Sequence, residues 1–157
     1  MDIDADSARV QFPPPLAFLG TLLLGVALSR LLGDPGLPLH RSTEHGIGAL
    51  AAVLGLGTIF SAIGLFRGAD TATRPWKRST ALITEGVYRW SRNPMYFGMA
   101  AAYVGIALWR DSLVALLLLI PLVLVIQREV IEREEAYLAA TFGERYLNYK
   151  ARVRRWI

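Results

Sequence analysis

Residues 82–96, with the sequence LITEGVYRWSRNPMY, join two long apolar runs and decide how the rest of the chain is arranged. The run before them, residues 46–66, carries no charge and matches the length of ~20 residues that crosses a bilayer. The chain becomes apolar again from Met95 onwards. We therefore interpret residues 82–96 as part of a polar loop at a membrane surface, with a membrane helix on each side.

Composition places the chain among integral membrane proteins. It is 54% hydrophobic, and its charged residues cluster between the apolar runs. The net charge of +4 comes from basic residues that flank these runs instead of lining one helix face, which argues against nucleic acid as a partner. The sequence has no cysteine and no His-rich spacing, so we expect no disulfide and no metal site.

Four apolar runs predict about four transmembrane helices. They cover residues 16–32, 46–66, 95–109 and 112–127. Only Arg110 and Asp111 separate the last two runs, and each of these runs is short for a full span. We therefore expect the last two helices to form a tight hairpin.

The basic residues fix the expected orientation. The loop at residues 67–92 holds six arginines and lysines against two acids, and such loops stay in the cytoplasm. An even number of spans puts both termini on the same side as this loop. The acidic N-terminus lacks the basic leader of a signal peptide, so we expect the first run to stay in the mature protein. These features predict a protein of the bacterial inner membrane with both termini and the active site in the cytoplasm.

We predict an all-α integral membrane protein with one domain, residues 1–157. Residues 1–66 would form an extended arm, reaching to the prolines at 13–15, and two anchoring spans. Residues 67–157 would form a catalytic loop, the hairpin and a cytoplasmic C-terminal helix. The second span carries small residues four apart, a spacing that lets helices approach closely in lipid. We expect these pairs to form a packing face: Gly48 and Ala52, Ala51 and Gly55, Gly57 and Ser61.

Polar and aromatic side chains converge where the third apolar run begins. Each is ordinary alone, because arginine and tyrosine are common at interfaces and proline in a first helical turn. Tyr88, Arg92, Asn93 and Tyr96 nevertheless fall together at one helix start. A helix N-terminus offers free N–H donors and a partial positive charge, which favours an anionic ligand group such as a carboxylate.

Two acids fall on the apolar side of the C-terminal helix. A solvated helix would account for Glu129 and Arg133, which can pair one turn apart. It would not account for Glu134 and Glu135, which lie beside the apolar stripe. A carboxylate there is costly unless it meets a cation or hydrogen-bond donors. With the helix start, these acids predict a pocket for a zwitterion with a cationic centre. The stripe itself contains Ile131, Leu138, Phe142, Tyr146 and Tyr149.

The sequence resembles the isoprenylcysteine carboxyl methyltransferase and phospholipid methyltransferase family of integral membrane enzymes. The resemblance covers roughly residues 78–155. Asn93 stands where the family usually has histidine, and Thr80 where some members have histidine. Asparagine keeps hydrogen-bonding capacity but cannot titrate. The motifs that carry the resemblance are Thr80-Ala81-Leu82-Ile83, Gly86-Val87-Tyr88, Arg92-Asn93-Pro94-Met95-Tyr96 with Gly98, Arg133-Glu134-Glu135, and Phe142-Gly143-Glu144-Arg145-Tyr146 with Tyr149.

The resemblance implies methyl transfer from S-adenosylmethionine to a lipophilic or membrane-embedded acceptor, either a carboxylate, an amine or a thiol. An amine must lose a proton, which Glu135 could accept. Arg92 or Arg128 could hold an anionic acceptor or headgroup, although Arg92 could equally be an interface residue. The lipid would enter between the hairpin and the second span. The cofactor-binding residues that the resemblance implies are Thr80, Ala81, Leu82, Ile83, Tyr88, Asn93, Pro94, Met95, Tyr96 and Glu134.

Two other functions stay open from the sequence. Membrane sterol reductases share a similar C-terminal motif and use a nicotinamide cofactor, but they are much longer. A non-enzymatic membrane protein could use the charged loop as a dock for lipids or a partner. Membrane lipids are expected partners in every case, and the oligomeric state is open.

Overall fold

A computed structural model describes residues 7, 8, 10, 12–69 and 71–157. This part of the chain is all-helical and contains no strand. The expected arm falls partly on residues 1–6, 9 and 11, which lie outside the described residues. The elements are α1 (Pro14–Leu32), α2 (Arg41–Gly68), η1 (Gly86–Arg89), α3 (Pro94–Trp109), α4 (Leu113–Ile126), η2 (Gln127–Ile131), α5 (Glu132–Phe142) and α6 (Glu144–Arg152).

Three helical stretches in the described residues are long and apolar enough to cross a membrane: Pro14–Leu32, Arg41–Gly68 and Leu113–Phe142. The third apolar run forms α3, whose 16 residues are about 24 Å long and short of a ~30 Å hydrocarbon core. The first helix begins earlier than expected, at Pro14. Its prolines occupy the first helical turn, where a missing N–H costs nothing.

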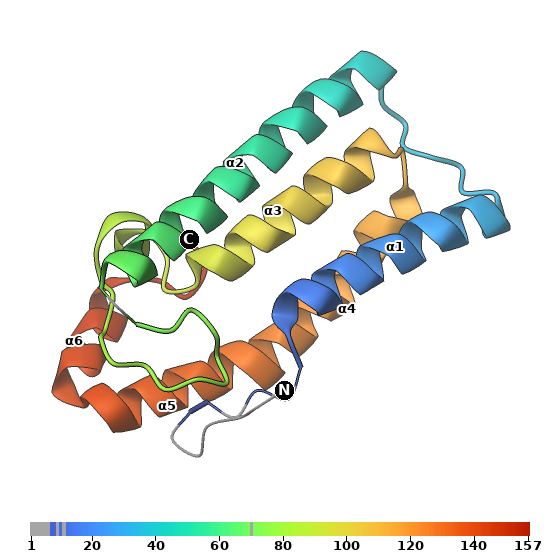
Figure 1. The fold of residues 1–157 in the computed structure, drawn as a ribbon. Helices are drawn as coiled ribbons and strands as arrows, with labels where there is room; N and C mark the ends of the chain where they lie inside the picture. Colours follow the sequence, from blue (N-terminus) through green and yellow to red (C-terminus); the bar gives the residue numbers. More distant parts are fainter. Residues whose placement is uncertain (1–6, 9, 11, 70) are drawn as a thin grey trace.

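The four apolar helices form two packed pairs that lie side by side (Figure 1). Helix α2 runs along α3, and α1 runs along α4. Residues 110–112 join α3 to α4, and Ser112 caps α4 by accepting a hydrogen bond from the Ala115 N–H at 3.1 Å. Each arm of the expected hairpin therefore packs mainly on a helix from the first half of the chain.

Small residues explain why α2 and α3 lie so close. A methyl group on Gly55 would lie 2.5 Å from the Gly98 carbonyl oxygen, and one on Gly105 would lie 2.5 Å from that of Gly48. The expected packing face is thus confirmed at Gly48 and Gly55, whereas Gly57 has nothing within 4 Å of its Cβ position. The same contact closes the route that we expected for a lipid between the second span and the hairpin.

The C-terminal half departs from the expected single tail helix in two ways. The helix formed by the fourth apolar run does not end at Gln127, because α4 continues through the π-helical turn η2 into α5. The tail is also divided at Gly143, which has φ +52° and ψ −131°, a conformation that only glycine adopts readily. Helix α6 therefore folds back from α5 toward the start of α3 (Figure 1).

Candidate functional site

Helices α5 and α6 and the long polar loop gather at one end of the bundle (Figure 1). Residues from these segments, from η1 and from the start of α3 line a cavity. It encloses about 790 Å³ of empty space, including its open mouth. The lining residues are Ala8, Phe66, Ala72, Thr73, Arg74, Pro75, Lys77, Ser79, Ala81, Leu82, Ile83, Tyr88, Arg92, Asn93, Met95, Tyr96, Glu134, Glu135, Tyr137, Leu138, Tyr146 and Tyr149.

Most of the residues singled out from the sequence lie on this cavity. Three do not. Thr80 is exposed, and its N–H donates to Thr71 Oγ1 at 2.9 Å. Pro94 is buried in the first turn of α3. Arg128 is exposed on η2. The predicted residues that line the cavity are Ala81, Leu82, Ile83, Tyr88, Arg92, Asn93, Met95, Tyr96, Glu134 and Glu135.

Several lining residues were not anticipated. Phe66 comes from the end of α2, and Arg74 and Lys77 come from the polar loop. Tyr137 also lines the cavity. Its hydroxyl oxygen accepts a hydrogen bond from the Ser79 N–H at 3.0 Å, which connects the loop to α5. Loop residues have no periodicity, so nothing in the sequence separated these from their neighbours. For Tyr146 a signal existed, since it belongs to the apolar stripe of the tail.

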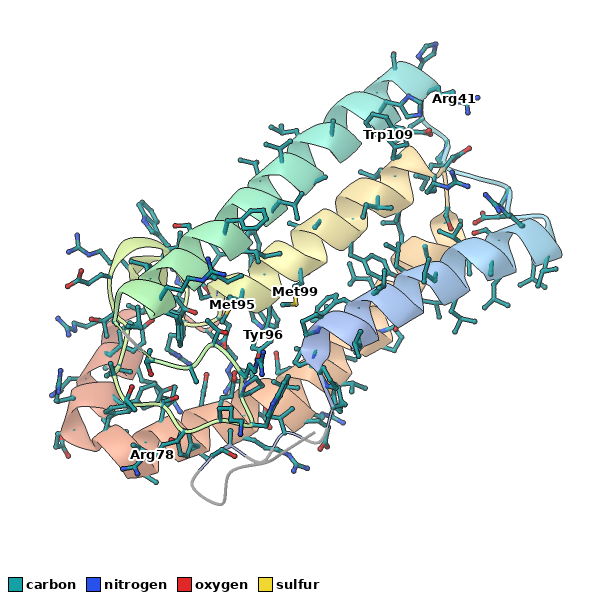
Figure 2. All side chains as sticks on the ribbon, viewed as in Figure 1. Arg41, Arg78, Met95, Tyr96, Met99 and Trp109 are labelled. Carbon is teal, nitrogen blue, oxygen red and sulfur yellow. The ribbon has the colours of Figure 1, made fainter. Side chains whose placement is uncertain are left out.

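Tyr96 and Glu134 connect the two sides of the cavity. The Tyr96 hydroxyl donates to Glu134 Oε1 at 3.0 Å, and only 5% of Tyr96 is exposed. Figure 2 shows Tyr96 with Met95 at the start of α3, at the opposite end of the helix from Trp109. The bond joins the start of α3 to α5 and fixes one oxygen of a carboxylate that lines the cavity.

Tyr88 is a second buried tyrosine that lines the cavity. Its carbonyl oxygen accepts the Tyr149 hydroxyl at 2.8 Å, and its ring packs against Phe66 with ring centres 5.7 Å apart. Burial, together with the Glu134 carboxylate, raises the pKa of Tyr88 well above the usual value for tyrosine. The Tyr88 hydroxyl therefore stays protonated and is able to donate a hydrogen bond to a ligand.

Glu135 lies at the centre of a cluster of three cations. Its carboxylate is 2.8 Å from Arg92 Nη2, 3.1 Å from Lys150 Nζ and 3.0 Å from Arg155 Nε. Only 5% of Glu135 is exposed. The cost of burying this charge is thus offset by direct ion pairs. The cluster joins α5 to the segment before α3 and to the C-terminal residues.

Sequence comparison identifies the group of proteins to which this site belongs. Residues 43–145 match the phospholipid methyltransferase family. The chain belongs to the phospholipid methyltransferase family. It is also 40% identical over 63 residues to an uncharacterized protein of Haemophilus influenzae, a stretch that is 40% of this chain and all of that protein. The chain matches no solved structure.

In this member of the phospholipid methyltransferase family, the first turn of α3 faces the cavity without a side-chain cap. Asn93 precedes the helix but makes no capping bond, and Met95 and Tyr96 follow in the first turn. Such a turn leaves backbone N–H groups available for a ligand. Arg92 lies beside it, and its Nε is buried without a hydrogen-bond partner among the described residues.

The matched segment of this phospholipid methyltransferase family member ends at residue 145. It therefore includes the polar loop, the start of α3, and Glu134 and Glu135 on α5. Most of α6 and the residues after it lie outside the match, although Tyr146 and Tyr149 line the cavity.

Proposed function

We propose that this protein transfers a methyl group from S-adenosylmethionine to a lipophilic acceptor at the cytoplasmic face of the membrane. The observation that carries the proposal is the cavity. Within the family-matched segment it combines a carboxylate on Glu134, a buried aromatic wall at Tyr88 and an uncapped helix start at Met95.

The residues on the cavity fit the cofactor chemically. Its amino-acid end carries a carboxylate, which suits the free N–H groups at the start of α3. Its cationic end suits the Glu134 carboxylate and the faces of Tyr88 and Tyr96, since aromatic rings attract cations. When bound, S-adenosylmethionine would supply a methyl group on a sulfonium. Ala81, Leu82 and Ile83 would form the apolar side of its site.

The ion pairs suggest different roles for Glu134 and Glu135. Glu135 meets Arg92, Lys150 and Arg155, so it is poorly suited to accepting a proton. We therefore propose that Glu135 holds Arg92 in place and that Glu134 faces the ligand. Arg92, which lines the cavity, would then supply positive charge for an anionic group of the acceptor. A carboxylate or thiolate acceptor would need no general base at all.

A lipophilic acceptor is favoured by the position of the cavity. It lies at the ends of helices whose outer faces are apolar and exposed, for example at Leu23 on α1 and Leu54 on α2. Such faces are compatible with lipid contact. Arg128, exposed on η2, is proposed to contact a lipid headgroup rather than the reacting atoms. The arginines of the polar loop favour the cytoplasmic side for this end.

Binding of S-adenosylhomocysteine to the detergent-purified protein tests the proposal. We expect saturable binding that Glu134→Gln weakens at least tenfold, while the exposed control Glu129→Gln changes it less than twofold. Binding of a nicotinamide cofactor instead would favour the reductase. Binding of neither would favour a non-enzymatic role. Incubation with labelled cofactor and a membrane extract would then identify the methylated acceptor.

A further inference from the structure

The C-terminal tail, residues 153–156, runs along the start of α3 after α6 ends at Arg152. The Arg92 N–H donates to the Arg154 carbonyl oxygen at 2.9 Å. Two side chains then bind the next carbonyl: Asn93 Nδ2 donates to the Arg155 oxygen at 3.0 Å, and Ser91 Oγ at 3.3 Å. The tail backbone is thus fixed to the residues that precede α3.

The side chains of the tail reach the other side of the cavity. Arg155 donates from Nε and Nη2 to the two oxygens of Glu135, both at 3.0 Å. These bonds raise the pKa of Arg155, so the pair stays charged. Farther along, Trp156 Nε1 donates to Gln127 Oε1 at 3.0 Å, on the π-helical turn. The tail backbone therefore binds the start of α3, while its side chains bind η2 and α5.

These contacts act on the same two elements that Tyr96 and Glu134 join. Glu134 is adjacent to Glu135, and a bidentate arginine contact restricts the orientation of a carboxylate more than a single ion pair does. Without the tail, the start of α3 and α5 would be joined by the Tyr96–Glu134 hydrogen bond and the Arg92–Glu135 ion pair alone among these contacts. Arg155, which lies beyond the family-matched segment, adds this bidentate contact next to Glu134.

We propose that the C-terminal tail is a strap that holds α5 against the start of α3, with Asn93 and Arg155 as positioning residues for Glu134. This inference rests on the proposed function. It gives Asn93 a different task from direct cofactor contact: its amide N–H holds the tail carbonyl. A titratable side chain is not needed for that task, because an amide always carries a donor.

Affinity for S-adenosylhomocysteine, measured by calorimetry in detergent, tests the strap. We expect Arg155→Met to weaken binding about tenfold and Arg155→Lys, which keeps the charge but loses the bidentate geometry, to weaken it about threefold. Asn93→Ala should weaken it about fivefold. The matched control Arg145→Met, on the exposed side of α6, should stay within twofold of the wild type.

Hydrogen–deuterium exchange on the ligand-free protein separates this inference from the proposed function. Arg155→Met and Asn93→Ala should each speed exchange at least threefold in residues 91–97 and 127–137, with unchanged helix content by circular dichroism. Failure of the wild type to bind S-adenosylhomocysteine would overturn the proposed function, whereas the exchange result would still report on the strap. Wild-type affinity and wild-type exchange in both variants would overturn the strap.

Discussion

Replacing Glu135 with glutamine should destabilise the protein by about 3 kcal/mol. Glutamine keeps the shape of the side chain but leaves Arg92 without its counter-charge. The pair is well buried, since the side chains of Arg92 and Glu135 are 10% and 6% exposed. Removing one partner of a buried ion pair costs about 3–5 kcal/mol, and the remaining amide oxygen keeps the loss near the lower limit.

The other two cations add little to this figure. The Lys150 and Arg155 side chains are 42% and 30% exposed, so they regain contact with water when Glu135 loses its charge. Exposed pairs contribute about 0–1 kcal/mol. For a chain of this length each kcal/mol lowers the melting temperature by about 2–4 °C, so we expect a decrease of about 6–12 °C.

Thermal unfolding in detergent, followed by the fluorescence of the four tryptophans, measures the shift. The matched control is Glu129→Gln, which breaks the exposed pair with Arg133, whose side chain is 43% exposed. This control should lower the melting temperature by at most about 4 °C. If both variants melt within 2 °C of each other, the reasoning about the buried cluster is wrong.

Three further changes have defined expected outcomes. Tyr96→Phe removes one hydrogen bond to Glu134, worth about 1 kcal/mol, so calorimetry should show about fivefold weaker S-adenosylhomocysteine binding; no change would contradict the role of this pair. Gly55→Leu places side-chain atoms against the backbone of α3 and should lower the melting temperature by at least about 5 °C, whereas Gly57→Leu, in open space, should not. Arg128→Ala should change turnover of the bound acceptor less than twofold, because Arg128 lies outside the cavity; a tenfold loss would place it at the reacting atoms.

Hydropathy predicted the first three apolar helices to within five residues, whereas the helix of the fourth run continues well beyond its predicted end. A chain in lipid must satisfy its backbone hydrogen bonds internally, so an uncharged run such as residues 46–66 has little choice but to be helical. Small residues at a spacing of four predicted a packing face on α2, because they let helices approach closely in lipid. That spacing could not identify the partner helix, because it shows only that a face permits close approach. The structure shows that the partner is α3, through Gly98 and Gly105.

The boundary between α4 and α5 shows what the sequence could not reveal. A change from apolar to charged residues at Gln127 marks the edge of an apolar environment, but it does not end a helix. The site shows a similar limit. Motifs and the helical stripe predicted Tyr96 and Glu134, whereas the contact of Arg155 with Glu135 joins separate elements through a reversal at Gly143. No periodicity encodes such a contact.

The unbroken helix from Leu113 to Phe142 has a consequence for the depth of the candidate site in the bilayer. From Leu113 to Glu134 it rises by about 32 Å, close to the thickness of a hydrocarbon core. The length of this helix therefore sets how far Glu134 lies from the opposite surface of the membrane. Lipids with longer chains would draw this carboxylate toward hydrocarbon and those with shorter chains would lift it into water, so the acyl length of the host membrane becomes part of the environment of the site.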